Sequence, residues 1–359
     1  MADLHPSQPP RPDPTRSSGL TARLVEPGAV EWEAVLAEAR HDFYHLPGYV
    51  SVSAPNDGGL PRALVVSDGD RTLLLPLVIR PIDGVAHDAC SPYGYPGPIQ
   101  TGEPDAGFEL DALLAGIDFL REQHIVSLFV RAHPLLNKSL PEGVGTVVQH
   151  GVTVWVDLTK SEDDLWSETR RNHRQQIRQA LKKGYVSEVD GGSRHMEDFK
   201  ALYHATMKDR AADAYYSFDD DYFAGLQRVL GDDLHIAVAM IDDVVAAAGM
   251  FVVTGDIAEM HLTGHDGRFA ADQPTKLVFH AVRTWAREHG LRVLHLGGGR
   301  GGSEDSLLHF KAGFSPWREP YRTLRVVVDE AAYARLVAAK HPDLDPSDLS
   351  RSFPAYRDD

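Results

Sequence analysis

The sequence has very little cysteine and no long apolar run. Its 359 residues include one cysteine, Cys90, so an internal disulfide cannot form. This usage is typical of proteins in a reducing cytosol. No stretch holds the roughly 20 consecutive apolar residues that a membrane-spanning helix needs. The sequence therefore predicts a cytoplasmic protein without membrane insertion.

An excess of positive charge is also missing. The formal net charge is −16, so an RNA partner would require a local basic surface. The length and the 43% hydrophobic content predict about two domains, each with its own core. Residues 1–20 are Pro-rich and have no apolar core segment, which predicts a disordered arm.

Familiar catalytic signatures are absent as well. No nucleophile elbow or Ser-His-Asp order occurs, which favours direct attack on a substrate over a covalent enzyme intermediate. The pairs His41/His45 and His261/His265 lack a third ligand at metal spacing. We therefore expect no catalytic metal.

What the sequence does contain is one order of elements that occurs twice. Each copy reads strand, acidic turn, strand, a third segment, helix, strand. The third segment of the first copy is rich in Pro and Gly, which argues against a central strand there. The predicted segments are 63–79, 87–102, 111–123 and 125–132, then 235–253, 257–265, 274–289 and 292–296.

This repeat predicts an α/β (α+β) fold of two tandem domains with the same topology. Each domain is expected to be a mixed twisted sheet flanked by helices. The predicted bounds are 21–150 for the first domain, 151–335 for the second and 336–359 for a C-terminal tail.

A basic helix is predicted over residues 163–183. Ser161 with Asp164 resembles a capping box, and Gly184 is a typical helix stop. Such a dense run can follow the phosphates of an RNA, although a solvated charged helix has the same pattern. Its basic residues are Arg170, Arg171, Arg174, Arg178, Lys182 and Lys183.

A glycine-rich turn follows the last strand of the repeat. Five glycines lie between residues 297 and 302, and Ser303 with Glu304 and Asp305 is expected to open a second helix that ends at Gly313. Bare backbone and helix N-termini can bind an anion or an acyl carbonyl.

Several motifs, taken in order, carry a family resemblance. They are SPYGYPGP (91–98), LWSETRRNHRQQIRQALKKG (165–184), YYSFDDDYFAGL (215–226), WAREHG (285–290), LHLGGG (294–299) and HFKAGF (309–314). Over about residues 24–328 the chain resembles the Fem-type aminoacyl-tRNA-dependent peptidyltransferases, a branch of the GCN5-related N-acyltransferase (GNAT) superfamily.

The resemblance implies two GNAT-like domains packed side by side. It also implies transfer of an aminoacyl group from tRNA to an amine, in peptidoglycan bridge formation or in natural-product assembly. Aminoacyl-tRNA would be the co-substrate, with no bound cofactor, and the acceptor would be a small-molecule or peptide amine.

Candidate catalytic residues follow from the resemblance and from strand periodicity. The family has a lysine near the acyl-transfer centre in a Phe-Lys pair, here Phe310-Lys311; an ammonium there can stabilise an oxyanion or hold a tRNA phosphate. Glu259, His261 and Thr263 alternate along a strand and so share one face. His261 or Glu259 can accept the amine proton. A surface lysine and a half-exposed polar strand are the plainer interpretations.

Candidate substrate-binding residues lie in two loops. Tyr93 and Tyr95 of the Pro-Gly segment can shape the acceptor pocket, although aromatics beside Pro and Gly often pack a loop. Asp305 flanks the glycine turn, where helix capping explains it equally well.

Two alternatives to the aminoacyl-tRNA reaction remain open. An acetyl-CoA-dependent N-acetyltransferase acting on a small-molecule amine would use the same fold, but residues 267–276, GRFAADQPTK, lack the glycine-rich turn that holds the CoA pyrophosphate. A non-catalytic binding protein would have lost the site, which the presence of Lys311 and the glycine turn argues against.

Overall fold

The computed structural model describes residues 19–191, 194–210 and 214–358. The arm predicted over residues 1–20 falls outside this range apart from Gly19 and Leu20. Within the described residues, no helix combines the length and the apolar character that crossing a bilayer requires.

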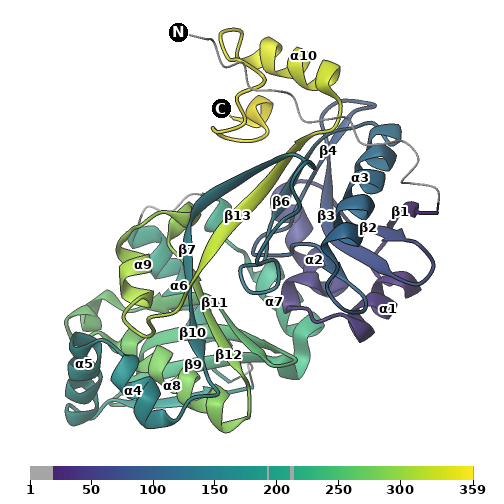
Figure 1. Ribbon diagram of the computed structural model, residues 1–359. Coiled ribbons are helices and arrows are strands. Elements are labelled where there is room, and N and C mark those ends of the chain that lie inside the picture. The colour runs from purple at the N-terminus through teal and green to yellow at the C-terminus, as the bar shows by residue number, and fades with distance from the viewer. Residues whose placement is uncertain (1–18, 192–193, 211–213, 359) are drawn as a thin grey trace, which may run out of the picture.

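The strands of the described chain form one mixed sheet of 13 strands (Figure 1). Their order in the sheet is β1-β2-β3-β4-β6-β13-β7-β12-β11-β10-β9-β8, with β5 paired to β3. The strands are β1 Thr21–Val25, β2 Leu60–Ser67, β3 Thr72–Pro81, β4 His87–Cys90, β5 Ile99–Gln100, β6 Ile125–Arg131, β7 Thr146–Asp157, β8 Val186–Asp190, β9 Leu234–Ile241, β10 Val244–Thr254, β11 Ile257–His265, β12 Val293–Gly298 and β13 Arg318–Val327.

Helices cover both faces of this sheet. The α-helices are α1 Val30–Glu38, α2 Pro47–Ser53, α3 Ala106–Glu122, α4 Glu162–Glu168, α5 Arg171–Lys182, α6 Met196–Asp209, α7 Asp220–Leu230, α8 Pro274–Glu288, α9 Ser306–Lys311 and α10 Glu330–Lys340. Short 3-10 turns include η3 Ala214–Tyr216, η5 Gly267–Asp272 and η6 Arg300–Gly302.

The predicted internal repeat is present in the strand pairing. In the first half β2–β3 and β3–β4 are antiparallel and β4–β6 is parallel across α3. In the second half β9–β10 and β10–β11 are antiparallel and β11–β12 is parallel across α8. This confirms the α/β fold with two tandem GNAT-like halves.

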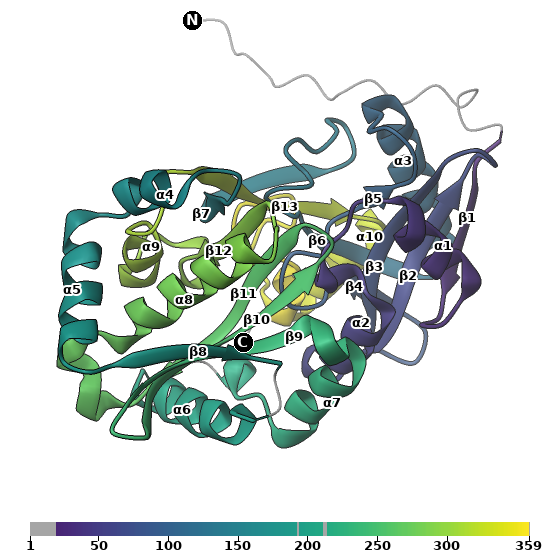
Figure 2. The same cartoon turned by 90° about the horizontal axis from the view of Figure 1, so that it is seen from below.

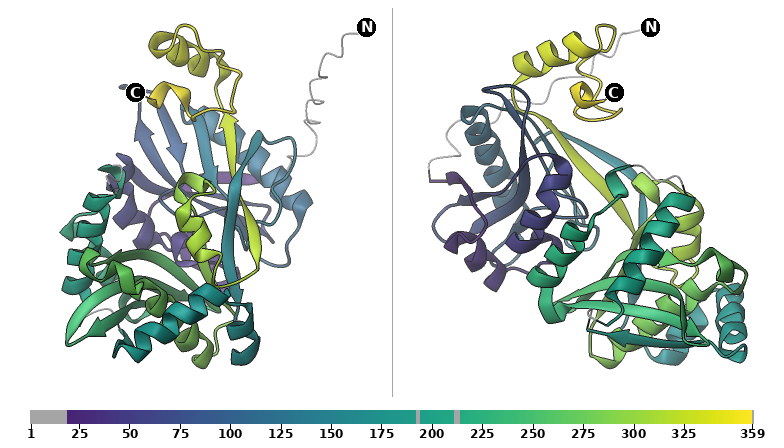
Figure 3. Two further views of the ribbon diagram at one scale, coloured as in Figure 1. Left: turned by 90° about the vertical axis from the view of Figure 1, so that its left-hand side faces the viewer. Right: turned by 180° about the vertical axis from the view of Figure 1, so that it is seen from behind.

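The two halves exchange their last strands. β7 follows β6 in the chain but pairs with β12 of the second half, and β13 follows β12 but pairs with β6 of the first half. β7 and β13 also pair with each other, and both run between the halves (Figure 1 and Figure 3). The division predicted at residues 150 and 151 falls inside β7 and stays a prediction.

Alternating residues of the inner strands pack into two hydrophobic cores, one on each face of the sheet in the second half. Ala247 and Phe251 of β10 pack with α8, whereas Ala248 and Met250 pack with α6. Figure 2 shows α8 and α6 on opposite sides of the strands β8–β11. Such strands are buried on both faces, which explains their nearly continuous apolar sequence.

The helix predicted over residues 163–183 is wrong as a single element, because the chain breaks it into α4 and α5. Thr169 is extended, with ψ 128°, and its hydroxyl donates to the Leu165 carbonyl. The next backbone N–H, of Arg170, donates to the Gly313 carbonyl at 2.7 Å. A tertiary hydrogen bond therefore replaces the helical one. Ser161 does cap α4, as predicted.

Three further expectations need correction. Residues 87–90 form β4, a central strand, because these four residues include no proline and so keep their N–H donors. α3 begins at Ala106 instead of Asp111, since Asp105 caps it. The helix that follows the glycine turn is α9, and its N-cap residue is Asp305 instead of Ser303. The Asp305 side chain accepts from the N–H groups of Leu307 and Leu308.

Arg283 on α8 joins α8 to α4 through buried hydrogen bonds. Its side chain is 1% exposed and donates to the Leu165 carbonyl, to Thr169 Oγ1 at 2.9 Å and to Glu162 at 2.5 Å. Arg283→Ala should lower the free energy of unfolding by about 3 kcal/mol, because buried acceptors lose a charged partner. Urea unfolding measures this.

The matched control for Arg283 is Arg292→Ala. Arg292 is 68% exposed and lies 3.8 Å from Asp256, so about 0.5 kcal/mol or less is expected. Equal effects of the two substitutions would contradict the assigned role of Arg283.

Candidate acyl-transfer site

The site lies where two parallel strands separate. β11 and β12 pair only from Ile257/Val293 to Glu259/His295. Gly297 then adopts φ 74°, and the register of β12 against β7 shifts between His295 and Gly297. This left-handed conformation favours glycine. The turn directs β12 away from β11 and leaves a cavity between them.

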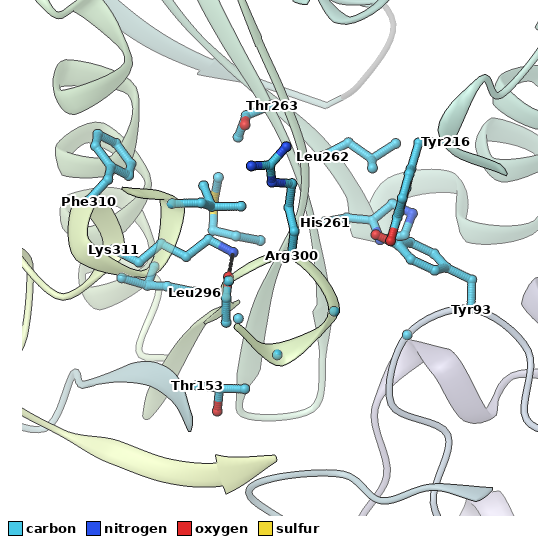
Figure 4. A pocket seen from close by; sticks show the side chains of 18 of the residues that line it. Tyr93, Thr153, Tyr216, His261, Leu262, Thr263, Leu296, Arg300, Phe310 and Lys311 are labelled. Atoms are coloured by element: carbon cyan, nitrogen blue, oxygen red, sulfur yellow. Dashed lines mark hydrogen bonds between the residues drawn. The ribbon is translucent and has the colours of Figure 1, made fainter. Parts of the chain in front are cut away.

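The cavity has a volume of about 640 Å³ and receives side chains from both halves. The first half contributes Tyr93, Tyr95 and Arg131, and the second contributes the polar face of β11, the glycine turn and α9. Figure 4 shows Lys311 and Phe310 on one side of it and Tyr93 and Tyr216 on the other.

Lys311 extends from the last turn of α9 toward the glycine turn. Its Nζ donates to the Gly298 carbonyl at 2.8 Å. Burial lowers its pKa to about 8, although Glu259 and Asp305 act in the opposite direction. A side chain at Gly297 would bring its Cβ to 3.1 Å from Nζ and press on the end of the Lys311 side chain, so the left-handed backbone conformation is the stronger reason for glycine there.

Glu259, His261 and Thr263 line the cavity together, as their alternation on β11 predicted. Glu259 is 1% exposed, and its Oε2 lies 2.5 Å from His295 Nδ1. Burial, reinforced by the Asp42 charge, raises the pKa of Glu259 well above its ordinary value. The Glu259 carboxylate is therefore a stronger base than an exposed glutamate.

His261 is a weaker candidate for proton transfer than the sequence suggested. Its Nε2 is 2.9 Å from the Tyr222 hydroxyl. Burial lowers the pKa of His261 to about 3, with the Asp42 charge opposing the shift. A histidine with this pKa is neutral at pH 7 and a poor proton acceptor.

A second buried acid–histidine pair lies behind the first. Asp42 Oδ2 is 3.0 Å from His133 Nε2, and both residues are fully buried. Asp42, His133 and Glu259 offer ligand atoms that all lie within 4.8 Å of one another. This grouping joins three distant segments, and for that reason sequence spacing did not indicate it.

The protonation of His133 does not fit a metal ligand. Its Nδ1 accepts from the backbone N–H groups of Leu135 and Leu136, so the proton of the neutral ring is on Nε2. That Nε2–H donates to Asp42 and has no lone pair for a cation. The geometry is that of a hydrogen-bonded structural pair.

The remaining predicted substrate residues divide into two groups. Tyr93, Tyr95, Phe310 and Thr263 line the cavity. Asp305 does not appear among the lining residues; its carboxylate caps α9 and also accepts from the Arg300 backbone. Capping therefore accounts for Asp305.

The basic residues of the predicted RNA surface are used in different ways. Arg170 contacts His309, Arg174 donates to the last carbonyls of α4, and Lys183 pairs with Asp272. Arg178 lies over the Trp166 ring. Arg171 and Lys182 are exposed, and neither makes a side-chain hydrogen bond or ion pair to the described residues.

Sequence reasoning missed part of the cavity wall. Arg131, Tyr215, Tyr216 and Tyr321 line it, and His295 lies behind it. Tyr215, Tyr216 and His295 stand inside motifs that supported the family resemblance, which is a usable signal. Arg131 ends an ordinary apolar strand, and no local pattern singles it out.

The lowered pKa of Lys311 can be measured directly. In the folded protein, acetylation of Lys311 by acetic anhydride should show a titration midpoint near pH 8. The denatured protein is the control, because its lysines titrate near pH ~10.4. Mass spectrometry of the Lys311 peptide gives both curves, and coincident midpoints would exclude a desolvated ammonium at this position.

Comparison with known proteins agrees with this architecture. Residues 167–311 match the acetyltransferase (GNAT) domain. No curated protein matches the chain by sequence.

Among solved structures, FemX aligns with TM-score 0.64 and 14% identity, over 85% of this chain and 97% of FemX. The C-terminal domain (DUF2156) of a putative lysylphosphatidylglycerol synthetase from Agrobacterium fabrum aligns with TM-score 0.55 and 17% identity, over 86% and 95% of the two chains. L-PGS from Bacillus licheniformis gives 0.53 and 15%, over 83% and 92%. The chain thus has the Fem-type GNAT fold that its motifs indicated, and its GNAT domain is that of an acyltransferase.

Proposed function

We propose that this protein moves an aminoacyl group from aminoacyl-tRNA to an amine and forms an amide bond. The observation that carries the proposal is the Lys311 ammonium, held beside the Gly297–Gly298 backbone where β11 and β12 separate. The reaction belongs to natural-product or peptidoglycan-precursor biosynthesis in the cytoplasm, and it needs no resident cofactor.

The cavity supplies the groups that this reaction needs. The acceptor nitrogen attacks the ester carbonyl, the C–N bond forms, and the bond to the ribose oxygen breaks. Lys311 stabilises the oxyanion, and with a pKa of about 8 it can also give a proton to the leaving ribose oxygen. Glu259 accepts the proton that the amine loses.

The position of α5 supports tRNA as the donor. Arg170, the N-cap residue of α5, places its Nη1 2.7 Å from His309 Nε2 of α9. His173 Nε2 lies 2.9 Å from the Phe310 carbonyl. The exposed basic side chains Arg171 and Lys182 therefore stand on a helix that packs directly against the helix of Lys311. A single RNA strand that enters the cavity can contact the basic side chains of α5 and Lys311.

Acetyl-CoA as donor is the second candidate, and one observation favours it. Gln273, Pro274 and Thr275 at the start of α8 line the cavity, and a helix N-terminus can bind a phosphate. Against it, residues Gly267–Asp272 form the turn η5, capped by Asp266, where a glycine-rich loop would cradle pyrophosphate.

Binding of a charged-tRNA pool to the purified protein distinguishes the two donors. We expect binding that weakens steeply with salt and that CoA or acetyl-CoA does not displace. Arg171→Glu with Lys182→Glu should weaken binding and reduce the logarithmic salt slope by about 1 for each phosphate that the protein no longer neutralises. Filter binding across a salt series measures this.

The control for that surface is a double reversal elsewhere, Arg228→Glu with Arg351→Glu, which should leave the salt slope unchanged. Arg228 is on α7, and Arg351 is in the C-terminal segment. Acetyl-CoA binding without tRNA binding would contradict tRNA as the donor and favour the CoA-dependent reaction.

Lys311→Met should reduce aminoacyl transfer by about 100-fold or more, because the oxyanion loses its cation. Binding of charged tRNA should persist. Single-turnover transfer to a panel of amines, read by mass spectrometry, separates the two effects. Lys311→Arg retains charge and should remove the decline in rate above pH ~8 that deprotonation of Lys311 produces. Unchanged turnover in Lys311→Met would remove Lys311 from the mechanism.

A further inference from the structure

Arg131 is a cation in the cavity that the proposed chemistry does not use. It is the last residue of β6, the strand of the first half that pairs with β13. Its Nη1 donates to the backbone carbonyls of Ser91 and Pro92, directly before Tyr93. The guanidinium lies 5.1 Å from the Phe129 ring centroid. These contacts fix its position from one side.

The partners of the Arg131 guanidinium are neutral. They are the backbone carbonyls of Ser91 and Pro92. No carboxylate of the described residues lies within 4.0 Å of its nitrogens, whereas Arg300, one of the two other arginines that line the cavity, is paired with Asp305. The Asp57 carboxylate influences Arg131 only from beyond that distance.

A partly buried guanidinium without a counterion is unfavourable unless something else supplies the negative charge. Arg131 lines the cavity, so a bound molecule can supply it. Arginine offers a planar fork of donors that fits a carboxylate or a phosphate in two parallel hydrogen bonds. The charge requirement and the shape of the donor set therefore indicate the same kind of ligand.

We propose that the amine acceptor carries an anionic group, a carboxylate or a phosphate, which binds the guanidinium of Arg131. This inference rests on the proposed acyl transfer and specifies the substrate class: an amino acid, or an amine that bears a phosphate. The anion lies at the Tyr93 side of the cavity, and the amine reaches toward Lys311 and Glu259.

The arrangement of the cavity fits such a two-ended molecule. Tyr93 and Tyr216 stand opposite Lys311 in Figure 4, and Arg131 is held by the two residues before Tyr93. The volume of about 640 Å³ is within the range of pockets that enclose small molecules. Selection by charge would exclude amines without an anionic group, because the Arg131 cation would remain unpaired in the complex.

The test uses small anions and no acyl donor. Thermal unfolding is followed with sodium acetate, sodium phosphate or sodium chloride at equal ionic strength. Wild-type protein should be stabilised by acetate or by phosphate relative to chloride, and the more effective of the two identifies the group. Arg131→Gln should weaken the apparent affinity for that anion about 10-fold, the effect of one charge-assisted pair.

Two variants guard the interpretation. Arg322→Gln is the matched control: Arg322 also donates to a backbone carbonyl, that of Lys138, but does not line the cavity, and it should respond to anions like wild type. Arg131→Lys keeps the charge without the planar fork and should bind with intermediate affinity, which covers the case that Arg131→Gln does not fold.

Two results would overturn the inference: a wild-type protein that responds equally to all three salts, or an anion response that persists unchanged in the Arg131 variants. Either result leaves the proposed acyl transfer standing, because no donor or Lys311 chemistry is involved. Conversely, failure of tRNA binding leaves the anion measurement intact.

Discussion

The exchange of β7 and β13 is the constraint on which the rest of the molecule depends. Each half of the sheet is completed by the last strand of the other half, and the two exchanged strands pair along most of their length. The halves therefore cannot separate without breaking a continuous hydrogen-bonded ladder. The cavity between them inherits this fixed geometry, since Arg131 at the end of β6 and Lys311 after β12 belong to elements that flank the exchange.

The cavity is rich in positively charged side chains, although the chain as a whole has an excess of negative charge. The protein carries a formal net charge of −16, yet Arg131, Arg210, Arg300 and Lys311 line the cavity, with Glu259 as its acidic member. Glu259 is itself buried against His295. A positive pocket in an acidic protein attracts anionic substrates locally, while the surrounding surface discourages unspecific nucleic-acid binding. An aminoacyl-tRNA terminus and an anionic acceptor both fit this distribution.

Periodicity and capping in the sequence predicted the strand–turn–strand–helix–strand repeat and the shared face of Glu259, His261 and Thr263, because these depend on short-range geometry. The same reasoning joined α4 and α5 into one helix. Between these two helices, the hydrogen bond from the Arg170 N–H to the Gly313 carbonyl replaces a helical hydrogen bond. Local sequence patterns do not indicate a partner that lies 143 positions away along the chain. Sequence reasoning missed the pairs Glu259–His295 and Asp42–His133 for the same reason.

The sequence by itself determined the repeated topology and the glycine turn, since both rest on neighbours within a few residues. The family resemblance of its motifs made Lys311 a candidate. Tertiary structure alone decided which groups meet. It buried Glu259 against His295, made His261 a poor base, assigned Asp305 to capping, and brought Arg131 from the other half into the cavity. Burial and long-range pairing set charge states and partners, and both depend on contacts between segments that the linear order keeps far apart.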